Sequence, residues 1–193
     1  MKIKKLIGSM LCAFSLVFMT GCASDPKGAV EACMEAVKVM DLSSIATSDV
    51  EESINQGDTI LNSLKEYFNE TSSKIEYKIQ DTKVNGDKAT VTVEMTYTDA
   101  TPIYSAVMED AFKNPLQYSF SGEDATGKIE LFVSSFNGLK DSVKTNTAKC
   151  TVKFECMKES GGWLVDDVSD EFVDVITANA YTFFNNLEGN DKK

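Results

Sequence analysis

The stretch "ATVTVEMTYT", from Ala89 to Thr98, alternates apolar and polar side chains without a break. A period of two predicts a β-strand whose apolar face is buried and whose threonine-rich face is solvated. Residues 75–80 alternate in the same way, and the Asn85-Gly86 pair between the two stretches is typical of a tight turn. The sequence therefore predicts an antiparallel hairpin over residues 75–98.

A second hairpin is predicted near the end of the chain. Residues 148–156 alternate again, a Ser160-Gly161-Gly162 turn follows, and a second strand runs from Trp163 to Val168. Spacings of three and four between apolar residues predict helices over residues 29–40, about 50–69, 103–111, 129–143 and 172–187. Locally paired strands with helices on one face predict an α+β domain with an antiparallel sheet.

The N-terminus has the organisation of a secretory signal. A basic start from Met1 to Lys5 precedes an apolar run over residues 6–19, and small or polar residues follow. The run of roughly 14 residues is shorter than the ~20 that a membrane-spanning helix needs. We therefore expect a cleaved signal peptide over residues 1–21 rather than a transmembrane anchor.

The end of this signal, Met19-Thr20-Gly21 before Cys22, resembles a bacterial lipobox. The resemblance implies a lipid on the Cys22 thiol, cleavage before Cys22, and a membrane partner reached through that lipid. Ala23 stands where an aspartate would retain the protein at an inner membrane, so the expected location is the outer face of the bacterial cell membrane. The alternative, cleavage after Ala23, leaves Cys22 unexplained.

Length predicts a single domain after the signal peptide. We expect a tether over residues 22–28, one α+β domain over 29–188 and a disordered tail over 189–193, because roughly 170 residues can bury a full core.

Composition excludes several activities. The chain has 19 basic residues, all lysine, and it has no histidine. It therefore lacks the imidazole of a Ser-His-Asp triad and of common zinc sites, and the guanidinium fork that binds phosphate. Three lysines precede Cys22, so the mature chain has 16 basic and 30 acidic residues, a net charge of −14. Such a charge repels nucleic acid. We expect no nucleic-acid partner, no metal and no cofactor.

Two motifs resemble a known superfamily. "DPKGAVEACMEAVKVMD" at residues 25–41 and "KFECMKESGGWLVDD" at 153–167 resemble segments of small Gram-positive lipoproteins with the nuclear-transport-factor-two-like, or cystatin-like, cone. The resemblance implies a curved antiparallel sheet packed on helices, often with a pocket at its wide end. Tyr77, Met95 and Tyr97 are the residues expected to line such a pocket.

The cysteines beyond Cys22 leave two alternatives. Cys33, Cys150 and Cys156 all occupy apolar positions. Cys150 and Cys156 lie ~20 Å apart on one predicted strand, too far for a mutual bond. Either Cys33 forms a disulfide with Cys150 or Cys156, or all three are buried free thiols.

A run of acidic residues near the end of the chain raises the question of a calcium site. The run "DDVSDEFVD", residues 166–174, could suggest calcium, but it lacks the glycine and ligand spacing of a calcium-binding loop. Complementing the dipole at a helix start is the favoured interpretation.

The first function hypothesis is therefore a non-catalytic binding module for a small apolar ligand or an envelope protein. The alternative is a small isomerase or hydrolase that pairs a pocket carboxylate, Asp99 or Asp110, with a tyrosine.

Overall fold

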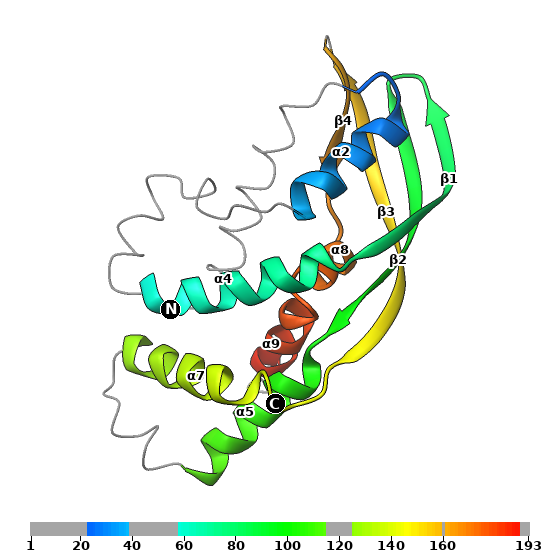
Figure 1. The fold of residues 1–193 in the computed structure, drawn as a ribbon. Coiled ribbons are helices and arrows are strands. Elements are labelled where there is room, and N and C mark those ends of the chain that lie inside the picture. Colours follow the sequence, from blue (N-terminus) through cyan, green and yellow to red (C-terminus); the bar gives the residue numbers. More distant parts are fainter. Residues whose placement is uncertain (1–22, 39–57, 115–124, 160, 190–193) are drawn as a thin grey trace.

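The computed structural model describes residues 23–38, 58–114, 125–159 and 161–189. Its strands form one antiparallel sheet in the order β1-β2-β3-β4, and helices lie against one face of it (Figure 1). The elements in chain order are α2 (Pro26–Lys38), α4 (Asp58–Ser73), β1 (Glu76–Asn85), β2 (Lys88–Asp99), α5 (Thr101–Lys113), α7 (Ala125–Leu139), β3 (Asn146–Glu159), β4 (Gly162–Asp167), α8 (Asp170–Ile176) and α9 (Ala180–Gly189). The predicted α+β class is confirmed.

Both predicted hairpins are present. Strand β2 pairs with β1 on one side and β3 on the other, so that Met95 lies opposite Tyr77 and Cys150. Gly86 adopts a φ of 62° in the first turn, a conformation that glycine reaches without strain. A register shift between Ile79 and Asp81 interrupts the alternation of β1, as a bulge does on an edge strand.

The inner face of the sheet is covered by α2 and α8. We call this packed layer the sheet core; its fully buried members include Val30, Met34, Val37, Val91, Val93, Met95, Phe154 and Phe172. The rings of Phe154 and Phe172 meet edge-on with centroids 4.9 Å apart, which joins β3 to α8. Because β2 places every second side chain in this layer, its threonines remain on the outer face, as predicted.

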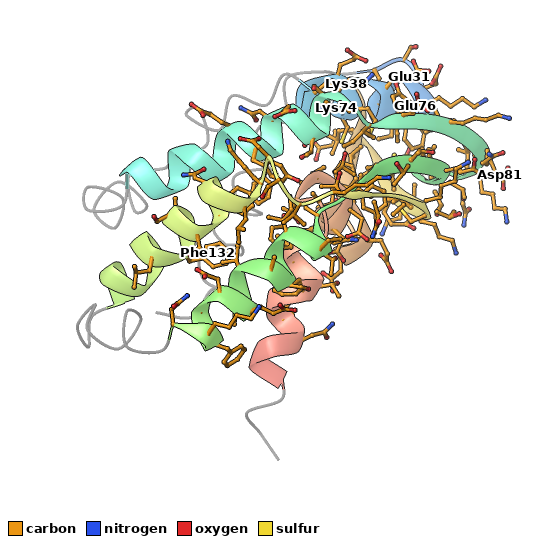
Figure 2. All side chains as sticks on the ribbon, turned by 60° about the horizontal axis from the view of Figure 1, so that its bottom comes forward. Glu31, Lys38, Lys74, Glu76, Asp81 and Phe132 are labelled. Carbon is orange, nitrogen blue, oxygen red and sulfur yellow. The ribbon has the colours of Figure 1, made fainter. Side chains whose placement is uncertain are left out.

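A second hydrophobic layer, the helical core, lies among the helices where β2 leads into α5 (Figure 1). Its aromatic members are Tyr67 and Phe68 from α4, Tyr104 from α5, Phe132 and Phe136 from α7, and Phe183 from α9. Tyr67 and Phe136 meet edge-on at 5.1 Å. Figure 2 shows Phe132 on α7 at this end of the molecule, whereas Asp81 lies at the opposite end.

The predicted tether over residues 22–28 is shorter than expected. Ala23 pairs with Trp163 through two backbone hydrogen bonds, of 3.1 Å and 2.9 Å. Helix α2 begins at Pro26 rather than at residue 29, because Asp25 accepts hydrogen bonds from Gly28 and Ala29 in the first turn. Residues 23–28 thus belong to the folded domain.

The prediction of one closing helix over residues 172–187 is wrong. Helix α8 ends at Ile176 and α9 begins at Ala180, with Ala178 and Asn179 at φ values of 51° and 69°. The carbonyl of Ala178 accepts a hydrogen bond from the backbone of Ala100, 3.0 Å away. A distant contact thus prevails over local helical periodicity.

Other predicted helix limits also shift. Helix α4 continues to Ser73, four residues beyond its predicted end, and α7 ends at Leu139 rather than at residue 143. Three predicted features lie outside the described residues. They are the end of the first helix at residues 39 and 40, the start of the second helix near residue 50, and most of the C-terminal tail.

The ring contact between Phe154 and Phe172 yields a stability prediction. We expect Phe154→Ala to lower the free energy of unfolding by ~3–5 kcal/mol, because it leaves a cavity in the sheet core. Phe112, 77 % exposed at the end of α5, offers the matched control, and its change to alanine should alter stability by at most ~0.5 kcal/mol. Urea unfolding measures both, and equal losses would contradict the assignment of Phe154 to the core.

Candidate functional site

A set of polar side chains lies where the sheet core meets the helical core. It joins the end of β2 to the connection between α8 and α9 and consists of Tyr97, Asp99, Asp174, Thr177, Asn179 and Thr182. We call it the polar seam. Strand pairing fixes Tyr97 and Asp99, while the left-handed turn at Ala178 and Asn179 directs the Asn179 side chain toward β2.

Asp99 is held as a carboxylate. Burial alone would raise its pKa, but hydrogen bonds from Thr101, Asn179 and Asn146 outweigh this and lower the pKa below the ordinary aspartate value. The backbone N–H of Thr101 donates to Asp99 Oδ1 at 2.9 Å, at the start of α5. A carboxylate stabilised in this way is a poor general acid or base at neutral pH.

The tyrosines around Asp99 remain protonated. Burial raises the pKa of Tyr97, and its hydroxyl donates to Asn179 Oδ1 at 2.9 Å. The Tyr104 hydroxyl, deeply buried, donates to the carbonyl of Thr177 at 3.0 Å. Both hydroxyl groups therefore serve to hold the α8–α9 connection against β2 and α5.

The pKa of Asp174 shifts in the opposite direction to that of Asp99. Burial raises its pKa above the ordinary value, hydrogen bonds from Thr182 partly oppose this, and the charges of Asp170 and Glu171 add to the rise. The carboxylate accepts both the backbone N–H of Thr182, at 2.8 Å, and its hydroxyl. It thereby caps the first turn of α9.

Tyr67 is the residue that the sequence did not single out. Only 8 % of it is exposed, and its hydroxyl oxygen is enclosed without a hydrogen-bond partner among the described residues. Burial raises the pKa of Tyr67 to about 12, with the charges of Glu70 and Asp99 adding to the rise. A buried hydroxyl of this kind is a neutral donor with an unused hydrogen bond. Helical spacing places Tyr67 on α4, but it does not indicate that the Tyr67 hydroxyl lacks a hydrogen-bond partner in the described part of the chain.

The three predicted pocket residues separate into two places. Tyr77 and Met95 are cross-strand neighbours, and Met95 is completely enclosed in the sheet core. The Tyr77 ring is half-buried beneath the Lys38 ammonium group, 5.3 Å from its centroid. Tyr97 instead belongs to the polar seam. Asp110 is engaged elsewhere, since Ser135 donates to its Oδ2 at 2.8 Å between α5 and α7.

The described cysteines are free thiols. Cys33 and Cys156 are buried in the sheet core, and Cys150 is half-buried. Burial raises the pKa of Cys33 far above its usual range and that of Cys156 to about 11, so both thiols stay protonated at neutral pH. The structure therefore has free thiols rather than a Cys33 disulfide, but of the three thiols expected to be buried only Cys33 and Cys156 are. Cys22 lies outside the described residues.

The acidic run is located at a helix start. Asp170 and Glu171 occupy the first turn of α8, where negative charge complements the helix dipole. Within residues 23–38, 58–114, 125–159 and 161–189, no three His, Cys, Asp or Glu side chains are grouped so that they could hold a metal ion. None of the described helices is both long and apolar enough to cross a membrane.

Comparison with known proteins gives one neighbour. No family profile matches the sequence, and no curated protein matches it significantly. Among solved structures, the fold is similar to that of YcdA from Bacillus subtilis, a protein provisionally described as a lipoprotein, with a TM-score of 0.43 and 17 % identity. The match covers 79 % of this chain and 47 % of YcdA, so the chain spans about half the length of that protein.

The raised pKa of Asp174 predicts a pH-dependent effect on stability. A proton binds Asp174 more tightly in the folded state than in the unfolded state, so its stabilising effect is present below the unfolded pKa of ~3.9 and is lost as pH rises through the folded pKa. The amide that replaces this carboxyl group in Asp174→Asn does not titrate. We therefore expect the stability of Asp174→Asn, relative to wild type, to increase from acid to neutral pH in urea unfolding.

Glu70 provides a control of opposite sign. Its hydrogen bond with Lys74 lowers its pKa, so the stability it contributes is present above the unfolded pKa and is lost as pH falls. Glu70→Gln should therefore lose stability relative to wild type as pH rises. A relative stability of Asp174→Asn that falls or stays constant with rising pH would refute the burial of the Asp174 carboxylate.

Proposed function

We propose that the protein is a lipid-anchored, non-catalytic binding module on the outer face of the bacterial cell membrane. Its anchor would be a lipid on Cys22, and its ligand a small, mainly apolar molecule that carries one hydrogen-bond acceptor. The anchor rests on the lipobox-like end of the signal sequence. The proposal of a ligand rests on the hydroxyl of Tyr67, which is buried in the helical core without a hydrogen-bond partner among the described residues.

The position of Ala23 supports the anchor. Two backbone hydrogen bonds hold Ala23, the residue next to Cys22, against Trp163 on β4. Two or three acyl chains bind a bilayer durably, because each buried methylene contributes ~0.8 kcal/mol. A domain fastened so close to its lipid would remain at the membrane surface.

The helical core supports an apolar ligand. An enclosed hydroxyl without a partner costs roughly 1–3 kcal/mol, and a bound acceptor would recover this hydrogen bond. The surroundings of Tyr67 are aromatic, with Phe68 and Phe136 in ring contact with it. Ligand sites commonly combine such an apolar lining with one or a few polar groups that fix orientation.

The polar seam favours binding over catalysis. A carboxylate–tyrosine enzyme needs a carboxylate free to exchange a proton with its substrate. Asp99 is stabilised as an anion, and Asp174 already accepts two hydrogen bonds from Thr182. The Tyr97 hydroxyl is likewise committed to Asn179. The isomerase or hydrolase alternative therefore has no group in the seam left for the reaction.

Membership of the nuclear-transport-factor-two-like cone superfamily is part of the same proposal. An antiparallel sheet with α2 packed across its inner face supports it. In that superfamily a pocket often lies at the wide end of the sheet, and here the helical core lies at the end where β2 leads into α5.

Acyl labelling tests the anchor. Cells that express the full chain should incorporate a labelled fatty acid into the wild type and not into Cys22→Ala. Cys150→Ala is the matched control, since it removes a half-buried thiol of the domain and should retain the label. Equal labelling of the Cys22→Ala variant would exclude Cys22 as the acceptor.

Two hydroxyl deletions test the ligand site. Native mass spectrometry of the purified wild type should detect a bound small molecule, and Tyr67→Phe should lose it. The ligand-free Tyr67→Phe variant should be as stable as wild type, or more stable by up to ~1–3 kcal/mol, because an unpaired hydroxyl is removed.

Tyr104→Phe is the matched control for Tyr67→Phe. It should keep the small molecule but lose roughly 0.5–1.5 kcal/mol, because it removes the hydrogen bond from the Tyr104 hydroxyl to the buried carbonyl of Thr177, which still accepts one from the backbone N–H of Ala180. A wild type that carries no small molecule, or a Tyr67→Phe variant that still carries it, would reject the proposed site. An envelope protein would then be the remaining partner class.

A further inference from the structure

The start of the folded domain has a defined place on the molecule. Ala23 forms an antiparallel bridge with Trp163 on the edge strand β4, and Pro26 is already buried at the start of α2. In Figure 1 the blue start of α2 lies at the same end of the sheet as the β1–β2 and β3–β4 turns. The chain therefore enters the domain beside the tips of both hairpins.

The two hairpin tips form one continuous surface with this entry point. The backbone N–H of Lys158 donates to the carbonyl of Asp87 at 2.8 Å, which holds the end of β3 against the β1–β2 turn. We call residues 23–28, 81–89, 156–159 and 161–163 the tip surface. Val84, 57 % exposed on the first hairpin, is an apolar side chain in contact with solvent there.

The charge of the tip surface differs from that of the remaining chain. Its charged side chains are four exposed lysines and four acids, a net charge of zero: Lys27, Lys83, Lys88 and Lys158 against Asp25, Asp81, Asp87 and Glu159, with Lys83 and Asp81 3.8 Å apart. The mature chain as a whole carries −14, so all of this net negative charge lies outside the tip surface. This asymmetry orients the domain in the field of an anionic surface, with the tip surface toward that surface.

We infer that the tip surface lies against the phospholipid headgroups of the bilayer that holds the Cys22 lipid, with the helical core directed away from the membrane. The inference rests on the lipidation of Cys22. Consecutive Cα atoms are ~3.8 Å apart, so a lipid on Cys22 brings the Ala23–Trp163 bridge to the headgroup layer.

The tip surface is suited to that layer. Its exposed lysine side chains can pair with headgroup phosphates while their alkyl stems lie along apolar surface. Val84 offers an apolar side chain to the boundary between headgroups and acyl chains. The acidic remainder of the domain is repelled by the same phosphates, which favours the same orientation.

Trp163 provides a built-in probe, because it is the single tryptophan of the chain. The lipidated full-length protein is placed in vesicles of phosphatidylcholine and phosphatidylglycerol in which some lipids carry a nitroxide on the headgroup. We expect the nitroxide to quench Trp163 fluorescence relative to vesicles without nitroxide. Flotation of the same vesicles on a density gradient reports the anchoring itself.

Charge reversal separates headgroup contact from tethering. The combined change Lys83→Glu, Lys88→Glu and Lys158→Glu should reduce the quenching and leave flotation unchanged. The matched control reverses three exposed lysines of the opposite end, Lys113, Lys144 and Lys149, and should keep the wild-type quenching.

Each result decides one claim. A wild type that floats but whose Trp163 is not quenched would overturn the orientation and leave the anchor intact. Quenching that persists in the tip variant would overturn headgroup contact by the lysines. A wild type that does not float would overturn the anchor and the orientation together.

Discussion

The burial of one face of β2 is the interaction on which the other features depend. The strand is flanked by β1 and β3, and each of its inward side chains from Ala89 to Tyr97 is enclosed. A slip of one residue in this register would place the threonines in the core and the valines in water. The register therefore fixes the sheet core. Because β2 continues without interruption, it also sets where Tyr97 and Asp99 meet the α8–α9 connection.

The local part of this arrangement can be predicted from the sequence. The period of two, together with the Asn85-Gly86 and Gly161-Gly162 turns, is sufficient for both hairpins, because these pairings join neighbouring segments. The break between α8 and α9 cannot be predicted in this way. It depends on partners far apart in the sequence, among them Tyr97 with Asn179 and Tyr104 with Thr177, which are separated by 82 and 73 residues. Helical periodicity continues through this segment, so the local pattern predicts a single helix that the tertiary contacts interrupt.

At the candidate site too, local patterns can be predicted from the sequence and the effects of distant contacts cannot. The strand pattern points to Tyr97, which does belong to the polar seam, whereas Met95 and Tyr77 are packing residues of the sheet. The sequence pattern misses Tyr67 and Asn179, for different physical reasons. Asn179 matters because of a left-handed backbone conformation that only the fold imposes. Tyr67 matters because a hydrogen bond is missing, and only the complete set of neighbouring groups makes that visible.

Strand β2 also relates the two ends of the molecule to each other. It begins at Lys88 in the tip surface and ends at Asp99 in the polar seam. Twelve residues at about 3.3 Å each separate these ends by roughly 40 Å, about the full thickness of a bilayer with its headgroups. With the tip surface against the membrane, the helical core would therefore be well clear of the headgroups. A ligand that reached Tyr67 would then enter from the aqueous side of the envelope rather than directly from the bilayer. Its affinity would have to come from apolar burial and the free Tyr67 hydroxyl, since the net negative charge of the chain disfavours anionic ligands.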